Sequence, residues 1–535
     1  MAQRIDRAAS FGQNLYVDTR GAAGEPVPFT QAVINGLAQG GGLYVPEELP
    51  TLSLDEICAL ARLPYAQRAA AIYKAFNVDL PDEAIDELMG RAYGDNFDDE
   101  AICPITSLDE STHILELWHG PTSAFKDMAL QCLPHFFSAS AEKLREEGTL
   151  DHEFMILVAT SGDTGKAALE GFKGVDGVSI GVLFPDGGVS DIQRKQMVTT
   201  TGDNVQVWAV RGNFDDCQTG VKHSFADEKF AEKLLDEYRI ALSSANSINW
   251  GRLLPQVVYY ISSYAELVAA GKIEAGCPID VCVPTGNFGN ILAAWYAKQI
   301  GVPIERLLCA SNDNRVLTDF INTGTYDISD REFILTSSPS MDILVSSNLE
   351  RQLFELTGRN GEAIRQWMAD LADARCFRVD VPPRAGELQR RFRGQRHLSR
   401  HHPRSARRPR LPAGSPHRCG LRRRSEPARR EPRPHRLHGP LGKIRQQRLP
   451  GDSRHRAFWR VARGRGRAHR LRAEQAHRRG NGQASHPRRT CQPGYNAITI
   501  HRSYRQRRRG HRGRRRGVPH PLGLPGTEAM PSWAS

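Results

Sequence analysis

The sequence of 535 residues has no apolar run that could form a membrane-spanning helix, which needs about 18 residues or more. Its first 21 residues also lack the apolar core of a secretory signal, so we expect a cytoplasmic protein. The ten cysteines include no CxxC pair, which argues against a zinc module or a disulfide scaffold, and we expect no metal. With 40% apolar residues, the chain can nevertheless bury a large core.

Lysine is almost absent from one part of the chain. Residues 386–535 hold 40 arginines and one lysine, Lys443, against six acidic residues, whereas residues 1–385 are net acidic. The net charge of +12 therefore comes entirely from this tail. With three Ile and two Val, the tail has too little periodic apolar content to offset the entropy of ordering, and we expect these C-terminal 150 residues to be disordered or aberrant.

The sequence from about residue 105 to 385 has the pattern of an α/β protein. We expect strands at 154–160, 178–185, 204–210 and 279–285, and helices at 166–172, 190–200 and 291–300. A repeated order of strand, short loop and helix predicts parallel sheets covered by helices. Ligands bind beyond the carboxyl ends of such strands, so the loops that follow the strands are candidate sites.

One such loop contains Ser161, Gly162, Asp163 and Thr164, between a predicted strand and a predicted helix. Small residues expose backbone N–H groups and the hydroxyls add donors, at a helix N-terminus where the dipole favours an anion such as a carboxylate. An ordinary helix cap with turn glycines explains the same residues, and the segment alone does not decide between the two.

A second loop contains Gly286, Asn287, Phe288, Gly289 and Asn290 and opens the next predicted helix. Two glycines and two asparagines allow a nest of N–H groups that could hold a phosphate dianion. The loop is neither GxGxxG nor GK[ST], so we do not expect a dinucleotide or ATP.

Lys126 lies in the segment HGPTSAFKD, residues 119–127. A lysine after a turn is usually a solvated charge, but Phe125 and Met128 give this one apolar neighbours. Desolvation favours the neutral amine that Schiff-base chemistry requires. A desolvated lysine, a phosphate nest and a separate carboxylate loop together indicate pyridoxal 5'-phosphate and an amino-acid substrate.

The segments HGPTSAFKD, ATSGDTGKAA and PTGNFGN, in this order, resemble those of threonine synthases. The resemblance covers residues 14 to about 385 and includes NLYVDTRG, GGGLYVPEELP, SANSINWGRLLPQ and SSPSMDILVSSNLER. The motifs GGGLYVPEELP and SSPSMDI favour threonine synthase over the related cysteine synthases and threonine dehydratases.

The resemblance implies PLP fold type II, which is the fold of the tryptophan synthase β subunit. It implies an N-terminal region with helices at 1–105, including a helix at 82–93, and a catalytic core at 106–385.

The same resemblance implies roles for the candidate residues. Lys126 would form the Schiff base with pyridoxal 5'-phosphate and then act as a base. The residues from Gly286 to Asn290 would bind the cofactor phosphate, and those from Ser161 to Thr164 the substrate carboxylate. The implied reaction converts O-phospho-L-homoserine and water to L-threonine and phosphate, by a monomer or homodimer with no membrane or nucleic-acid partner.

The phosphate of the substrate needs donors of its own. Ser247, Asn249 and Arg252, in the segment SANSINWGR, are candidates, and an ordinary helix cap explains them equally well.

The tail has two explanations. Residues 414–420 can be encoded so that a one-base offset gives Asp-Pro-His-Thr-Ala-Val, and residues 438–445 so that the same offset gives Thr-Ala-His-Ser-Ala-Lys-Phe-Gly. Threonine synthases carry similar segments in this order, so we favour a frameshift between Arg384 and Phe392. The alternative is a genuine basic arm that binds nucleic acid, fused to an enzyme-derived core.

The frameshift hypothesis has a functional consequence. In the family, the Thr of the closing segment bonds the pyridine nitrogen of the cofactor, and the chain as written lacks that segment. We therefore expect the chain to bind the cofactor poorly or to misfold, because a truncated sheet leaves strand edges exposed.

Overall fold

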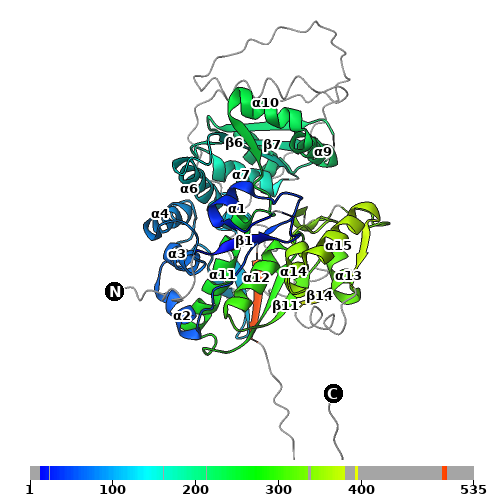
Figure 1. Ribbon diagram of the computed structural model, residues 1–535. Helices are drawn as coiled ribbons and strands as arrows, with labels where there is room; N and C mark the ends of the chain where they lie inside the picture. The colour runs from blue at the N-terminus through cyan, green and yellow to red at the C-terminus, as the bar shows by residue number, and fades with distance from the viewer. Residues whose placement is uncertain are drawn as a thin grey trace, which may run out of the picture.

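The computed structural model describes residues 13–22, 24–160, 162–212, 214–334, 336, 339–379, 392–395 and 497–502. Two main sheets lie in separate halves of the molecule (Figure 1). One half contains β6, β7 and the helices α7, α9 and α10, and the other contains β11, β14 and the helices α11 to α15.

The first sheet has four parallel strands in the order β8-β7-β6-β9. Their bounds are β6 Glu153–Ala159, β7 Val178–Pro185, β8 Val205–Val210 and β9 Ile240–Ser243. Its helices are α7 Asp163–Phe172, α8 Asp191–Thr199, α9 Phe214–Ala226 and α10 Glu228–Tyr238. All eight residues of β7 are buried, as expected for a central parallel strand that is covered on both faces. The predicted alternation of strands and helices is confirmed here.

Local sequence explains where α8 begins. The Ser190 hydroxyl accepts a hydrogen bond from the backbone N–H of Gln193, and the Gln193 side chain accepts one from the backbone N–H of Ser190. This capping box satisfies two N–H groups that a helix N-terminus leaves without acceptors. It also fixes the Gln193 side chain near the start of α7, where its amide group donates a further hydrogen bond.

The second sheet has the order β14-β11-β10-β15-β5-β4. The bounds are β4 Ile105–Ser107, β5 Thr112–Glu116, β10 Ile279–Pro284, β11 Ile304–Ala310, β14 Phe392–Gln395 and β15 Ala497–Arg502. Strands β10, β11 and β14 are parallel, and β15 runs antiparallel to both of its neighbours. Helices α12 Gly289–Ile300 and α13 Val316–Thr323 follow β10 and β11.

Two strands of this sheet come from the arginine-rich tail, which we expected to be disordered or aberrant. Within residues 386–535 the structure describes only 392–395 and 497–502, where β14 pairs with the edge of β11 and β15 lies between β10 and β5. The reason is local composition: residues 497–500 alternate small or polar residues with isoleucine, which suits a buried strand. The rest of residues 386–535 lies outside the described part of the chain.

The N-terminal region contains the expected helices and a small sheet that we did not predict. Its helices are α1 Phe29–Asn35, α2 Leu54–Ala59, α3 Tyr65–Ala75 and α4 Asp82–Ala92, with a 3-10 turn, η1, at Leu60–Arg62. The sheet has the order β2-β1-β3, with bounds β1 Leu15–Asp18, β2 Val27–Pro28 and β3 Tyr44–Pro46. The domain boundaries inferred from the sequence stay predictions.

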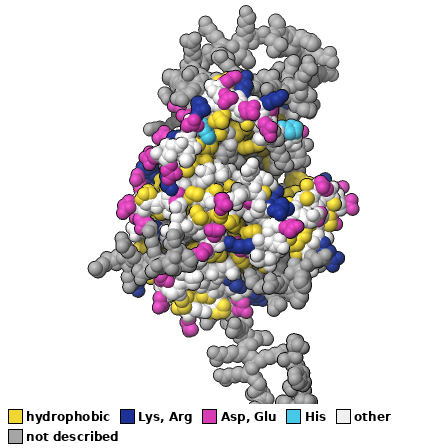
Figure 2. Space-filling view, viewed as in Figure 1, with side chains coloured by type: hydrophobic (Ala, Val, Ile, Leu, Met, Phe, Trp, Pro, Cys, Tyr) yellow, Lys and Arg dark blue, Asp and Glu magenta, His cyan; other side chains and the backbone are white. Residues whose placement is uncertain are grey.

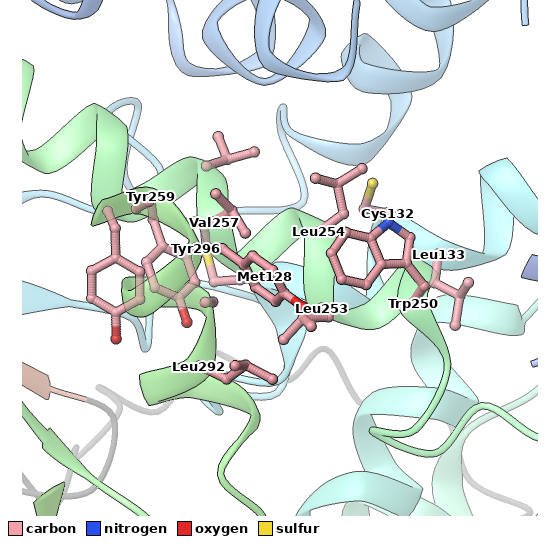
Figure 3. Packing of buried hydrophobic residues seen from close by; sticks show 14 of the residues in the cluster. Met128, Cys132, Leu133, Trp250, Leu253, Leu254, Val257, Tyr259, Leu292 and Tyr296 are labelled. Atoms are coloured by element: carbon pink, nitrogen blue, oxygen red, sulfur yellow. The ribbon is translucent and has the colours of Figure 1, made fainter. Parts of the chain in front are cut away.

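A long helix, α11 Trp250–Ala269, runs through the core and is buried along most of its length. It contacts α5 Asp127–Leu130, α6 Leu133–Glu146 and α12. Figure 3 shows this packing, with Met128, Cys132, Leu133, Leu292 and Tyr296 gathered around the α11 residues Trp250, Leu253, Leu254 and Val257. The core therefore fixes the segment that carries Lys126 relative to the helix that follows the 286–290 loop.

The remaining elements lie after β11. They are β12 Thr325–Asp327, the 3-10 turn η2 Pro339–Met341, α14 Leu349–Leu356, α15 Gly361–Asp373 and β13 Cys376–Arg378, which pairs with β12.

Candidate active site

A tight turn places Lys126 directly before α5. The buried Asp127 carboxylate fixes this turn, because it accepts hydrogen bonds from the backbone N–H of Thr122 at 2.8 Å and from the Thr122 hydroxyl at 2.7 Å. Gly120 is required, since a Cβ there would lie 2.4 Å from the Cβ of Asp127. Burial raises the pKa of Asp127 to about 6, although the hydrogen bonds oppose that shift.

Lys126 is half-buried as a residue, and its Nζ lies 5.9 Å from the centre of the Phe125 ring. Desolvation lowers the pKa of this amine to about 8; Asp163 opposes the shift, whereas the cations Arg252 and Lys166 add to it. An exposed lysine has a pKa of about 10.4, so Lys126 holds a much larger neutral fraction near neutral pH. The neutral amine is the form that attacks a carbonyl carbon.

The loop before α7 turns on Gly162, whose φ is 140°. A Cβ at Gly162 would lie 2.3 Å from the Gln193 side chain, so this position excludes other residues. The Thr160 hydroxyl accepts hydrogen bonds from the backbone N–H groups of Gly162 and Gly165, at 3.0 and 2.9 Å. These two groups are therefore used to cap the helix, and Ser161 lies outside the described residues.

The amides of Asp163 and Thr164 differ from those two, because no described residue accepts a hydrogen bond from them. They lie at the N-terminus of a ten-residue helix, where an anion is favoured. Within the described chain, these two backbone N–H groups are therefore the candidate donors for the predicted carboxylate site.

The side chain of Asp163 has a different role from the one we expected. One carboxylate oxygen accepts a hydrogen bond from Nε2 of Gln193 at 2.9 Å and lies 3.3 Å from Nζ of Lys166, and the other accepts a hydrogen bond from the Ser340 hydroxyl. Burial alone would raise its pKa, but Lys126, Lys166 and these hydrogen bonds hold the pKa of Asp163 well below its usual value. A carboxylate that stays ionised repels a second carboxylate, so this side chain is not a ligand for the substrate carboxylate.

The 286–290 loop joins β10 to α12. Phe288 is the residue before α12, is buried, and has a φ of 65°, in the left-handed region that non-glycine residues rarely adopt. In the described part of the chain, no acceptor is found for the backbone N–H groups of Gly286, Asn287 and Gly289. These groups lie at the N-terminus of a twelve-residue helix and could hold a phosphate dianion.

Asn290 differs from the rest of this loop. Its side-chain oxygen accepts hydrogen bonds from the hydroxyls of Tyr259 and Tyr260, at 2.7 and 2.6 Å. The side chain therefore ties the start of α12 to α11, and only its amide nitrogen and its backbone N–H stay as candidate donors.

The turn η2 brings the two loops together. A Cβ at Gly286 would lie 3.2 Å from Cα of Met341, and the adjacent Ser340 donates its hydrogen bond to Asp163. The buried Asp342 carboxylate fixes this turn, because it accepts hydrogen bonds from the side-chain amides of Asn312 and Asn314 and from the backbone N–H and hydroxyl of Thr336. The start of α7 and the start of α12 thus face the same turn.

The three candidates for the substrate phosphate separate in the structure. Asn249 is fully buried and is a helix cap: its oxygen accepts from the backbone N–H of Gly251 at 2.9 Å, and its amide group donates to the carbonyl oxygen of Val33 at 2.8 Å. Its functional assignment is therefore replaced by the structural one. Ser247 is half-buried, and its carbonyl oxygen accepts a hydrogen bond from the Asn348 side chain at 3.1 Å.

Of the three residues, Arg252 is the strongest candidate for binding the substrate phosphate. Its side chain is buried, and one guanidinium nitrogen donates to the carbonyl oxygen of Ala245 at 2.8 Å. Its Nε has no hydrogen-bond partner among the described residues, and burial lowers the pKa of the guanidinium to about 10. A buried cation that forms no ion pair within the described chain is costly unless an anion binds it.

Comparison with known proteins gives consistent matches. A family described as threonine synthase N terminus matches residues 15–93. The threonine synthase of Pseudomonas aeruginosa is 42% identical over 360 residues, which are 67% of this chain and 71% of that protein. The chain belongs to the threonine synthase family. Human threonine synthase-like 1 is 46% identical over 360 residues, which are 66% of this chain and 48% of that protein. The chain thus spans about half the length of these threonine synthase-like relatives.

Solved structures of the family confirm the predicted PLP fold type II. A PLP-bound threonine synthase from Brucella melitensis has a TM-score of 0.65 and 40% identity, over 72% of this chain and 78% of that one. Threonine synthase from yeast has a TM-score of 0.66 and 35% identity, over 72% and 77%.

Sequence reasoning missed three residues that shape the site. They are Lys166, Gln193 and Ser340. Lys166 and Ser340 lie in segments that carried the resemblance to threonine synthases, so the signal was present without a role attached to it. Gln193 follows Ser190 at the spacing of a capping box, and that spacing predicts the cap but not the contact with Asp163.

Metal-binding groups and membrane-spanning helices are two other features that bear on function. Across the described ranges, no group of three or more His, Cys, Asp or Glu side chains is arranged to hold a metal, and no helix is long and apolar enough to cross a membrane. Figure 2 shows acidic side chains spread around the visible face, in keeping with the acidic composition of residues 1–385.

Proposed function

We propose that this chain is a pyridoxal 5'-phosphate-dependent threonine synthase that converts O-phospho-L-homoserine and water to L-threonine and phosphate. The observation that carries the proposal is Lys126, a half-buried residue whose amine has a pKa lowered to about 8 and is close enough to Asp163 for that carboxylate to oppose the shift. The starts of α7 and α12 both contact η2 near this carboxylate, and each offers an anion site.

The residues present fit the cofactor. The N–H groups of Gly286, Asn287 and Gly289 suit its phosphate, and the close approach of Gly286 to Met341 leaves little room for a side chain at that position. Lys126 would join the aldehyde carbon covalently. When bound, the cofactor would supply an electron sink for the removal of protons from the substrate.

Lys126 is also suited to moving protons. The reaction requires a proton to leave Cα and another to leave Cβ, and later requires protons to return. An amine with a pKa near 8 can both accept and release protons close to neutral pH. The Asp163 carboxylate stabilises the protonated amine and so supports the acid half of this exchange.

The substrate would bind through its two anionic ends. The N–H groups of Asp163 and Thr164 suit the carboxylate, and the Arg252 guanidinium suits the phosphate that leaves. Ser247, which lies close to Arg252 in the sequence, is a further candidate for the phosphate. Loss of phosphate from Cγ and addition of water at Cβ then complete the reaction.

The experiment is covalent labelling of the purified 535-residue chain. We expect pyridoxal 5'-phosphate and borohydride to label the peptide that contains Lys126, weakly in the chain as written and fully in a chain that carries the offset sequence from residue 386 onward. We expect the offset chain to release phosphate from O-phospho-L-homoserine and to form threonine. Lys126→Arg should abolish both, whereas Lys173→Met, at an exposed lysine directly after α7, should change neither. Labelling at other lysines only, without threonine formation, would refute the proposal.

A second preparation tests the frameshift hypothesis. If the tail is out of frame, a chain that carries the offset sequence from residue 386 onward should bind the cofactor much more tightly than the chain as written. Equal binding by the two chains would argue against the hypothesis. Resequencing of the gene between the codons for Pro383 and Gln395 is the direct check.

The nucleic-acid alternative has its own test. A genuine basic tail should give DNA binding whose affinity falls steeply with salt concentration, because lysine and arginine contacts to phosphates release counterions. We expect no such binding. A cytoplasmic location and a monomeric or homodimeric state stay predictions.

A further inference from the structure

A second lysine lies beside Lys126 and has no role in the function proposed above. Lys166 is in the first turn of α7, and its side chain is 9% exposed. Its Nζ donates to the carbonyl oxygen of Thr122 at 3.1 Å and lies 3.3 Å from a carboxylate oxygen of Asp163. A buried ammonium group is stable only when it is paired and hydrogen-bonded, and both conditions hold here.

The two acceptors of Lys166 lie on different segments. Thr122 belongs to the turn that ends at Lys126, and Asp127 fixes this turn from the other side. Asp163 begins α7 and is the carboxylate that acts on the Lys126 amine. Lys166 therefore connects the turn that carries Lys126 to the carboxylate whose charge opposes the lowering of the Lys126 pKa.

We propose that Lys166 is a positioning residue for Lys126: its ammonium group binds the Thr122 carbonyl and the Asp163 carboxylate together and so fixes the Lys126 turn against the start of α7. This inference rests on the proposed function only where it takes Lys126 to be the catalytic lysine. The position and the charge state of Lys126 can be measured without the cofactor.

The charged groups around the Lys126 amine come from three helices. Asp163 and Lys166 lie on α7, Arg252 lies on α11, and Asp127 begins α5 directly after Lys126. Asp163 stabilises the protonated amine, and Lys166 and Arg252 destabilise it by repulsion of like charges. Loss of the Lys166 charge should therefore make Lys126 harder to deprotonate.

The test is competitive acetylation of the cofactor-free 535-residue chain with acetic anhydride from neutral to alkaline pH, with the Lys126 peptide quantified by mass spectrometry. In Lys166→Met and in Lys166→Gln, the labelling midpoint of Lys126 should move upward by about one pH unit, the scale expected when one neighbouring like charge is removed. Lys166→Arg keeps the charge and should stay near the wild-type midpoint. Lys173→Met, which removes an exposed lysine directly after the same helix, should cause no shift.

Two results would overturn the inference. One is an unchanged Lys126 midpoint in both Lys166→Met and Lys166→Gln. The other is a midpoint in Lys166→Arg that moves as far as in those two neutral variants. A residue needed only for folding would affect the charged and the neutral variants alike. Cofactor labelling of the wild-type chain is scored separately. If the wild type takes up no cofactor while the midpoints shift as expected, the proposed function fails and the role of Lys166 stands.

Discussion

The strand β15 offers a sharp test of the fold, because it comes from a tail whose composition predicts no structure. Ile498 and Ile500 are 1% and 0% exposed and belong to the main hydrophobic core. Ile500 is paired with Val281 of β10 on one side and with His113 of β5 on the other. Both isoleucines point to the same face of the sheet, because side chains alternate along a strand.

We expect Ile500→Ala to lower the free energy of unfolding by about 2–5 kcal/mol, the usual cost of removing a large aliphatic side chain from a packed core. This is a large part of the total for a domain, which is about 5–15 kcal/mol. The double variant with Ile498→Ala should cost more, although not the sum, since the two positions are neighbours on one strand. Urea unfolding followed by tryptophan fluorescence measures each change.

Thr499→Ala is the matched control. Thr499 lies between the two isoleucines, points to the opposite face and is half-buried, so its loss should cost about 1 kcal/mol or less. If Ile500→Ala and Thr499→Ala unfold at the wild-type urea concentration, β15 is not part of the sheet. The edges of β10 and β5 would then be open, and the frameshift hypothesis would regain its prediction of an unstable chain.

Three further changes test the site. Gly162→Ala should destabilise the protein by about 1–3 kcal/mol in urea unfolding, because a φ of 140° strains any side chain and its Cβ would clash with Gln193; an unchanged midpoint would contradict the loop geometry. The pKa of Asp127 is raised to about 6 in the folded chain, so wild-type stability should fall as pH rises from about 4 to 6, and Asp127→Asn should remove that slope. Inorganic phosphate should protect the wild-type chain against thermal unfolding, and Arg252→Met should require at least ten times more phosphate for the same protection, since the buried cation is lost. Equal protection of the two chains would place the phosphate elsewhere.

Much of the α/β fold was predictable, because periodicity and burial report local structure directly. The run 178–185 is apolar except for Ser179 and forms a strand with the same bounds, and the run 291–300 lies within α12. The candidate loops were found for the same reason: each follows a strand and contains residues that suit a tight turn. Lys126 was singled out by its apolar neighbours, and desolvation is indeed the main cause of its lowered pKa.

The remaining features depend on contacts between distant segments. Ser340 lies 177 positions from Asp163, and no local pattern predicts their hydrogen bond. The choice between a cap and a ligand at Asn249 was decided by Val33, which is 216 positions away. The short Ile-Thr-Ile segment of β15 was obscured by the arginines around it, because average composition cannot report on six residues.

The place of β15 also has a consequence for synthesis of the protein on the ribosome. The strands β4 and β5 are made early, and β10 and β11 follow about 165 residues after β5, but the partner that joins these two groups ends at Arg502. Until that segment leaves the exit tunnel, the facing edges of β5 and β10 stay unpaired, and such edges are where nascent chains associate with one another. We therefore expect a chaperone that binds exposed strands to be retained on the growing chain until β15 has left the exit tunnel.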